Sequence, residues 1–217
     1  MNRIALEYSE IVSGAATDFS LVGRKRRNLL LVFQVNCPGC FLYALPIAAG
    51  LHRDLIHADV RILGLSTAFE DFEWNTLENT RALIQEGRLV GETEKAFAMQ
   101  DIRALPFALD FPVAFDSLRP SSDFSDEDFR AIAEAQPGYH TLPLSRRPGF
   151  IARVREHYQR QELLPATFTK NALAGTPSWI VYDAAGNILH SEFGHPRDIQ
   201  VLADALLTPD DTAAGGQ

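Results

Sequence analysis

The sequence predicts an α/β fold, and three observations support this class. Apolar runs at residues 29–35 and 60–65 are separated by a helical pattern, which is the element order of a βαβ unit. Two segments at 178–183 and 188–193, rich in β-branched and aromatic residues, flank a glycine-containing turn, as in a β-hairpin. Segments with the 3.6-residue apolar period of amphipathic helices lie between these two parts.

The first half of the chain contains the expected βαβ unit. Residues 3–12 weakly indicate an opening strand. Residues 29–35 are rich in Leu, Val and Phe and lack clean alternation, which is typical of a strand covered on both faces. Residues 41–54 indicate a partly buried helix, in which Pro46 should cause a kink because proline lacks an N–H. Residues 60–65 then predict the second strand, joined by a right-handed crossover.

The next elements alternate between helix and strand. Residues 76–86 predict an amphipathic helix that ends at Gly87. Residues 109–116 predict a short strand in which Pro112 marks an edge position or the start of the strand.

Residues 117–172 are expected to form a mostly helical insertion. Ser125, with an acid three residues later, predicts the cap of a helix that runs to about residue 135. A second helix is expected at about 148–163, because a proline suits its first turn and another proline follows its end.

The last part of the chain returns to β structure with the predicted hairpin and ends in a helix at 195–207. We expect residues 1–208 to form one domain that includes the insertion at 117–172. Residues 209–217 are expected to form a flexible tail.

The composition restricts the function classes. The chain has 217 residues, of which 46% are hydrophobic and 22% charged, as is usual for a globular protein with an ordinary core. The formal net charge of −8 argues against a general nucleic-acid binder, because phosphate contacts need a basic surface. Glu7 and Glu10 interrupt what would be the apolar part of a signal peptide, and no apolar run approaches about 20 residues. We therefore expect a cytoplasmic protein without nucleic-acid or membrane partners.

The candidate chemistry lies in one motif, Cys37-Pro38-Gly39-Cys40, which contains the only two cysteines and follows a buried strand. A dithiol catalyst needs one stabilised, accessible thiolate and a second thiol that resolves the mixed disulfide. A helix that starts beside Cys37 would stabilise its thiolate, and Pro38 suits the first turn of such a helix. The i, i+3 spacing places Cys40 on the same face. We therefore predict that Cys37 is the nucleophile and Cys40 the more buried, resolving thiol.

Two other roles would also fit a cysteine pair with this spacing. A zinc site can begin with the same C-x-x-C spacing, but it usually takes two more Cys or His ligands at close spacing. The six histidines show no such paired spacing. An inert pair of core cysteines is the other alternative, although an apolar strand leading directly into the motif argues against it. We expect no metal and no cofactor.

With these motifs the chain resembles the thioredoxin superfamily. Its C-x-x-C follows a buried strand, and Pro46 lies six residues past Cys40, similar to the proline that bends the active-site helix of that family. Residues 175–181 (GTPSWIV) and the hairpin that follows look like the family's cis-proline strand. The resemblance implies a thioredoxin-like central mixed sheet flanked by helices, with the insertion placed before the cis-proline strand.

The resemblance also implies roles for further residues. Thr176 and Pro177 would line a substrate groove beside the nucleophile. Asn36, Pro38 and Gly39 would support the motif; many thioredoxins have tryptophan at the position of Asn36.

Within the superfamily, the chain most resembles the TlpA/ResA-like and peroxiredoxin-like branch, whose members carry extra structure between the two halves. Residues 65–71 (LSTAFED) and 111–116 (FPVAFD) look like segments of this branch. Peroxiredoxins place Thr or Ser three residues before the peroxidatic cysteine, whereas this chain has Gln34 there. That difference argues against typical peroxidase activity.

Thioredoxins also bury an acid in the strand before the motif, at or near the position of Leu31 in this chain. Glu70, Asp71 and Glu73 are candidates to replace that proton acceptor, although all three are more typical of charges on a surface loop.

The resemblance implies a thiol–disulfide oxidoreductase. Its partners would be a protein or small-molecule disulfide substrate and a thiol reductant or reductase. Two alternatives stay open: a peroxiredoxin-like thiol peroxidase that uses the same pair, and a redox-switched binding or adaptor protein whose insertion recognises a partner.

Overall fold

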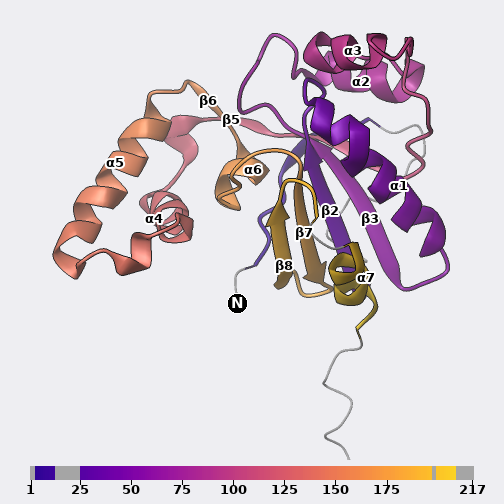
Figure 1. The fold of residues 1–217 in the computed structure, drawn as a ribbon. Coiled ribbons are helices and arrows are strands. Elements are labelled where there is room, and N and C mark those ends of the chain that lie inside the picture. Colours follow the sequence, from indigo (N-terminus) through magenta and orange to yellow (C-terminus); the bar gives the residue numbers. More distant parts are fainter. Residues whose placement is uncertain (1–2, 13–24, 197–198, 209–217) are drawn as a thin grey trace, which may run out of the picture.

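A computed structural model of the chain describes residues 3–12, 25–196 and 199–208 (Figure 1). The tail predicted at 209–217 lies outside these ranges. Within them, no helix is both long enough and apolar enough to cross a membrane.

A six-stranded mixed sheet forms the centre of the fold, with the strand order β1-β4-β3-β2-β7-β8. Its strands are β1 (Tyr8–Ile11), β2 (Arg27–Phe33), β3 (Val60–Ser66), β4 (Val113–Asp116), β7 (Ser178–Asp183) and β8 (Ile188–Phe193). β2, β3 and β4 pair in parallel, whereas β1, β7 and β8 join their neighbours antiparallel. This sheet confirms the predicted fold class.

β2 is a central strand, and all seven of its residues are buried. It pairs with β3 on one side and with β7 on the other, so that Leu31 lies opposite Gly64 and Trp179. A strand enclosed in this way has no polar face, which explains the absence of alternation in its sequence. The strand ends at Phe33, two residues earlier than predicted, because the chain turns at Val35 and Asn36 toward the cysteine motif.

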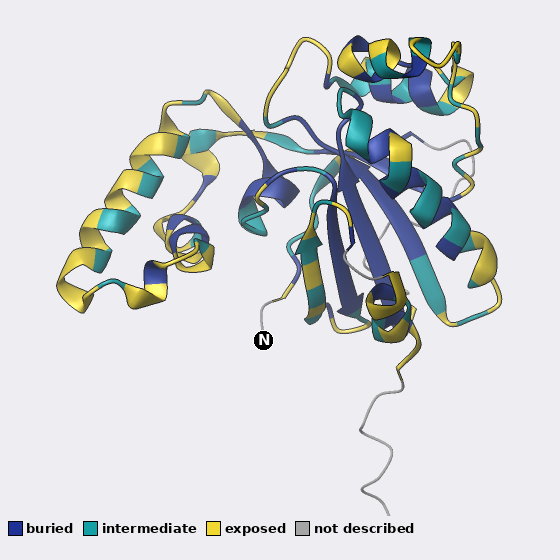
Figure 2. Ribbon diagram, viewed as in Figure 1, coloured by how far each residue is buried: buried dark blue, intermediate teal, exposed yellow. Residues whose placement is uncertain are grey.

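Helices cover both faces of the sheet (Figures 1 and 2). One core joins Leu29 and Leu31 of β2 to α1 (Leu45–Asp54), α2 (Leu77–Glu86), α3 (Gly91–Ala98) and α7 (Ile199–Leu207). The opposite core joins Leu30 and Val32 to Phe168 of α6 (Ala166–Lys170). The alternation of β2 side chains therefore separates two layers of helix.

The irregularity predicted at Pro46 takes the form of a π-helical turn, Cys40–Ala44, directly before α1. Pro46 cannot donate a backbone hydrogen bond to the carbonyl of residue 42, so the regular α-helical pattern cannot extend through it. The π-helical turn therefore begins at the second cysteine, Cys40.

The insertion contains more than the predicted helices. Besides α6, its elements are β5 (Leu118–Pro120), α4 (Asp126–Ala135), α5 (Arg147–Gln159), β6 (Leu163–Pro165) and short 3-10 turns at Ser121–Asp123, Tyr139–Thr141 and Leu144–Arg146. α4 begins with the predicted cap, in which Ser125 and Asp128 bond each other's backbone N–H groups. α5 ends before the predicted residue 163, because β6 pairs with β5 in a two-stranded sheet.

Figure 1 shows α4 and α5 projecting away from the central sheet, with β5 and β6 forming the connection. Phe129 and Ile132 of α4 pack with Leu164 of β6 in a small core of their own. α5 has no fully buried residue, and Figure 2 shows its surface as largely exposed.

Candidate active site

The cysteine motif lies just past the end of β2, where the chain enters the helical turn. Helical conformation begins at Pro38, so Cys37 directly precedes the first turn, as predicted. Cys37 is partly exposed and Cys40 is fully buried, and both are free thiols. Separate roles require one accessible thiol and one buried thiol, and the two cysteines differ in this way.

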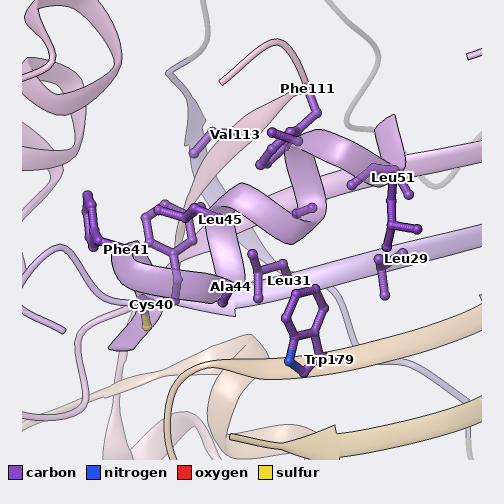
Figure 3. Packing of buried hydrophobic residues seen from close by; sticks show 14 of the residues in the cluster. Leu29, Leu31, Cys40, Phe41, Ala44, Leu45, Leu51, Phe111, Val113 and Trp179 are labelled. Atoms are coloured by element: carbon purple, nitrogen blue, oxygen red, sulfur yellow. The ribbon is translucent and has the colours of Figure 1, made fainter. Parts of the chain in front are cut away.

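Cys40 belongs to the main hydrophobic core. Figure 3 shows it beside Phe41, Ala44 and Leu31, with Trp179 in the same cluster. Burial raises the pKa of the Cys40 thiol well above its usual value, because an apolar surrounding disfavours the charged form. The negative charge of Cys37 raises it further.

The pKa of Cys37 is shifted in the opposite direction. A hydrogen bond with the side chain of Cys40 lowers the pKa of the Cys37 thiol to about 7, although burial and the charge of Glu70 oppose this shift. The backbone N–H of Cys40 also donates to the Cys37 sulfur at 3.3 Å. Hydrogen bonds of this kind favour the thiolate. At neutral pH a large fraction of Cys37 is therefore in the nucleophilic form.

Thr176 and Pro177 lie beside the motif, although 139 residues separate Thr176 from Cys37. The register of β7 on β2 places Ser178 opposite Val32, so the residues just before β7 lie next to those just after β2. The Cys37 thiol donates to the carbonyl oxygen of Thr176 at 3.7 Å, and the Thr176–Pro177 peptide bond is cis.

Gln34 links Thr176 to the loop that follows β3. Its side chain is 2% exposed, accepts a hydrogen bond from the Thr176 hydroxyl at 3.0 Å and donates to the carbonyl oxygen of Glu70 at 3.3 Å. In the sequence, Gln34 stands out only for lacking a hydroxyl. A polar residue directly after the apolar residues 29–33 is the signal that points to this role, because buried polar groups need partners.

Asn36 fixes the turn before Cys37. Its amide group donates to the Asp71 carboxylate at 2.9 Å and accepts from the backbone N–H of Glu92 at 2.7 Å, while its own N–H donates to the Asn75 side chain at 3.0 Å. Gly91 lies against it with φ +55°, and a Cβ there would be 2.2 Å from the Asn36 amide oxygen. Only glycine fits this close approach.

Pro38 and Gly39 form the first helical turn. A Cβ on Gly39 would lie 3.1 Å from the hydroxyl oxygen of Tyr43, whose ring contacts His195 with 4.5 Å between centroids. The small residue at position 39 therefore lets Tyr43 pack close to the motif.

The three acids proposed as replacements for a buried proton acceptor, Glu70, Asp71 and Glu73, are all exposed. Of these, Glu70 is close enough to raise the pKa of Cys37.

The acid buried beside β3 is Asp116, at the end of β4, which the sequence analysis did not single out. Burial raises its pKa to about 6, while its carboxylate accepts hydrogen bonds from the Thr67 hydroxyl and from the backbone N–H groups of Thr167 and Phe168. These partners show that Asp116 anchors the start of α6 to the sheet.

In the part of the chain that the structure describes, no group of three or more His, Cys, Asp or Glu side chains is arranged to hold a metal ion.

Comparison with known proteins places this site in a known fold. No protein-family model and no curated protein matches the chain. Its structure is similar to that of a thiol-disulfide isomerase from Corynebacterium glutamicum, with a TM-score of 0.58 and 24% identity over 96% of this chain and 97% of that one. A thioredoxin-like superfamily protein gives a TM-score of 0.56 and 22% identity over 94% and 95% of the two chains. The chain therefore has a thioredoxin-like fold.

Proposed function

We propose that this protein is a thiol–disulfide oxidoreductase in which Cys37 attacks a substrate disulfide and Cys40 resolves the mixed disulfide. The observation that carries the proposal is the asymmetry of the pair. Cys37 is partly exposed with a pKa lowered to about 7, whereas Cys40 is buried with a raised pKa. The fold shared with a thiol-disulfide isomerase supports the same chemistry.

In the first step the Cys37 thiolate attacks one sulfur of the substrate disulfide. A bond forms between Cys37 and that sulfur, the substrate S–S bond breaks, and the other substrate sulfur leaves as a thiolate. The Thr176 carbonyl and Pro177 lie beside the Cys37 sulfur and would orient the incoming chain. Gln34 would hold Thr176 in place through its hydroxyl.

In the second step Cys40 attacks the Cys37 sulfur. Formation of the mixed disulfide removes the negative charge of Cys37, which is one of the causes that raise the pKa of Cys40. Cys40 can then give its proton to a departing substrate thiolate and form the Cys37–Cys40 disulfide. The first substrate thiolate takes from solvent the proton that Cys37 released on ionising, so the substrate leaves as two thiols, having gained two electrons. A thiol reductant or reductase then returns the pair to the dithiol form.

The substrate would be a protein or small-molecule disulfide, and the cytoplasm is the compartment expected from the sequence. The thiol peroxidase alternative has less support, because the amide group of Gln34 is occupied by Thr176 and Glu70 and brings no hydroxyl to the Cys37 thiol.

A Cys40→Ser variant is expected to stop after the first step and to hold a peptide disulfide substrate as a mixed disulfide on Cys37. Mass spectrometry of the non-reduced protein, followed by peptide mapping, measures the adduct and its position. The matched control is Cys37→Ser, which keeps only the buried thiol and is expected to form little adduct. Equal adduct formation by the two variants would contradict the assigned roles.

If neither variant forms an adduct and the parent protein turns over no disulfide, the oxidoreductase proposal is wrong. A redox-switched adaptor would then be the better account of the pair.

A further inference from the structure

An open groove of about 930 Å³ lies between the loop that joins β3 to α2 and the base of the insertion. Figure 1 shows this loop rising beside β5 and β6. We call it the insertion groove and define it by its apolar lining residues, which are Phe69, Phe72, Leu77, Phe115, Leu118 and Leu163. Its size falls in the range of about 300–1,000 Å³ that is usual for ligand sites.

Two of the apolar residues that line the groove are open to solvent. Phe72 is 50% exposed and Leu163 is 41% exposed, and they belong to opposite sides, the β3–α2 loop and β6. Contiguous apolar surface that stays exposed is typical of a binding surface. A bound apolar group would remove both side chains from water.

The charges at the groove are all of one sign. Glu70 and Glu162 are exposed carboxylates of its lining, and among the described residues that line it there is no Lys, Arg or His. Asp116 also contributes to the wall, but its carboxylate is already bonded by Thr67, Thr167 and Phe168. The groove therefore favours an apolar group that is accompanied by a cation.

Hydrogen bonds through Glu70 and Gln34 link the insertion groove to the candidate active site. Glu70 lines the groove, its carbonyl oxygen is held by Gln34, and Gln34 in turn accepts the hydroxyl hydrogen bond of Thr176. The charge of the Glu70 carboxylate also acts to raise the pKa of Cys37. A chain bound at the Cys37 sulfur that runs toward Glu70 would place its neighbouring residues at the groove.

We propose that the insertion groove binds the polypeptide flank of the disulfide substrate, with an apolar side chain inside and a Lys or Arg against Glu70 and Glu162. This inference rests on the proposed oxidoreductase function and specifies its substrate class. A polypeptide supplies both an apolar group and a cation next to its cysteine. A small disulfide such as oxidised glutathione has no apolar side chain and is net negative despite its two ammonium groups, so the two glutamates repel it.

The test compares three substrates of the reduced protein: a disulfide peptide with Leu and Lys beside its cysteine, the same peptide with Ser and Glu there, and neutral hydroxyethyl disulfide. The Leu-Lys peptide is expected to have a kcat/KM about tenfold higher than the Ser-Glu peptide, a difference typical of one apolar group in a pocket. Phe72→Ser is expected to remove most of this preference. Glu162→Gln should lower it about two- to threefold, since an exposed ion pair is weak.

Both variants should reduce hydroxyethyl disulfide at the rate of the parent protein, because neither residue lies at the dithiol. Leu144→Ser is the matched control, since Leu144 is 75% exposed on the insertion but does not line the groove. It should leave all three rates unchanged. Thermal unfolding of each variant verifies that it is folded.

Four results would each overturn the inference. An unchanged peptide preference in Phe72→Ser would assign the groove to another occupant, such as a small apolar molecule or a second copy of the chain. An equal loss in Leu144→Ser would show that the effect does not come from the groove. If the protein reduces hydroxyethyl disulfide but shows no preference between the peptides, only the proposed role of the groove is wrong. If it reduces none of the three substrates, the oxidoreductase function is wrong as well.

Discussion

Replacing Cys37 with serine is expected to lower disulfide turnover about a thousandfold or more, which corresponds to about 4 kcal/mol of lost transition-state stabilisation. The reason is that Cys37 is the partly exposed thiol and the one whose pKa is lowered to about 7, while Cys40 is fully buried. A serine hydroxyl in its place is not ionised at neutral pH and cannot form a mixed disulfide. Steady-state reduction of a peptide disulfide measures the loss.

The matched control for this prediction is Cys40→Ser. It should also lose steady-state turnover, but it should release about one equivalent of substrate thiol in a single fast phase, because the first step needs only Cys37. A fast phase that survives in Cys37→Ser and disappears in Cys40→Ser would reverse the two roles.

Trp179→Ala is expected to lower the free energy of unfolding by about 3–5 kcal/mol, the usual cost of truncating a buried aromatic side chain. Trp179 is fully buried, lies opposite Leu31 of the central strand and donates from its indole N–H to the carbonyl oxygen of Gly194 at 3.0 Å. Figure 3 shows its ring packed beneath Leu31 in the core that also contains Cys40. Denaturant unfolding measures the change.

Leu189→Ala is the comparison for the Trp179 variant, because Leu189 lies on the neighbouring strand β8 and is 41% exposed. It should cost about 1 kcal/mol or less. Similar losses for both variants would mean that Trp179 does not have the packing role that its burial indicates.

The sequence was informative wherever a short segment carries its own signal. β2 is a wholly buried strand, and its residues 29–33 form an uninterrupted apolar run. α4 begins with the Ser125 and Asp128 cap that its sequence predicts. The hairpin of β7 and β8 follows from its turn. In each of these cases the pattern that selects the element lies within the element itself.

The elements that were missed depend on partners elsewhere in the chain. β6 has three residues and ends in a proline, so it has no periodic signal and exists because β5 pairs with it. α3 begins at Gly91 with φ +55°, and its preceding residue Val90 offers no side-chain cap. The usual signals for the start of a helix are therefore absent.

The same distinction applies to the candidate site. The cysteine motif is local, and its place between a buried strand and a helix start, together with its spacing, predicts two thiols with different burial. The contacts of Gln34 with Thr176 and of Asn36 with Glu92 join residues 142 and 56 positions apart. Such pairs follow from strand register and loop packing, which a single sequence does not specify.

The most direct test of the central claim is alkylation of the reduced protein by iodoacetamide. Its rate is measured as a function of pH, and peptide mapping identifies the modified cysteine. Because its pKa is lowered, Cys37 stays ionised at lower pH than an ordinary thiol. Its alkylation rate should therefore fall tenfold per pH unit below about pH 7 and level off above it. Cys40 should stay unmodified across this range, because it is buried and its pKa is raised. Labelling of Cys37 with a midpoint near the usual thiol value of about 8.5, or equal labelling of Cys40, would contradict the proposed roles.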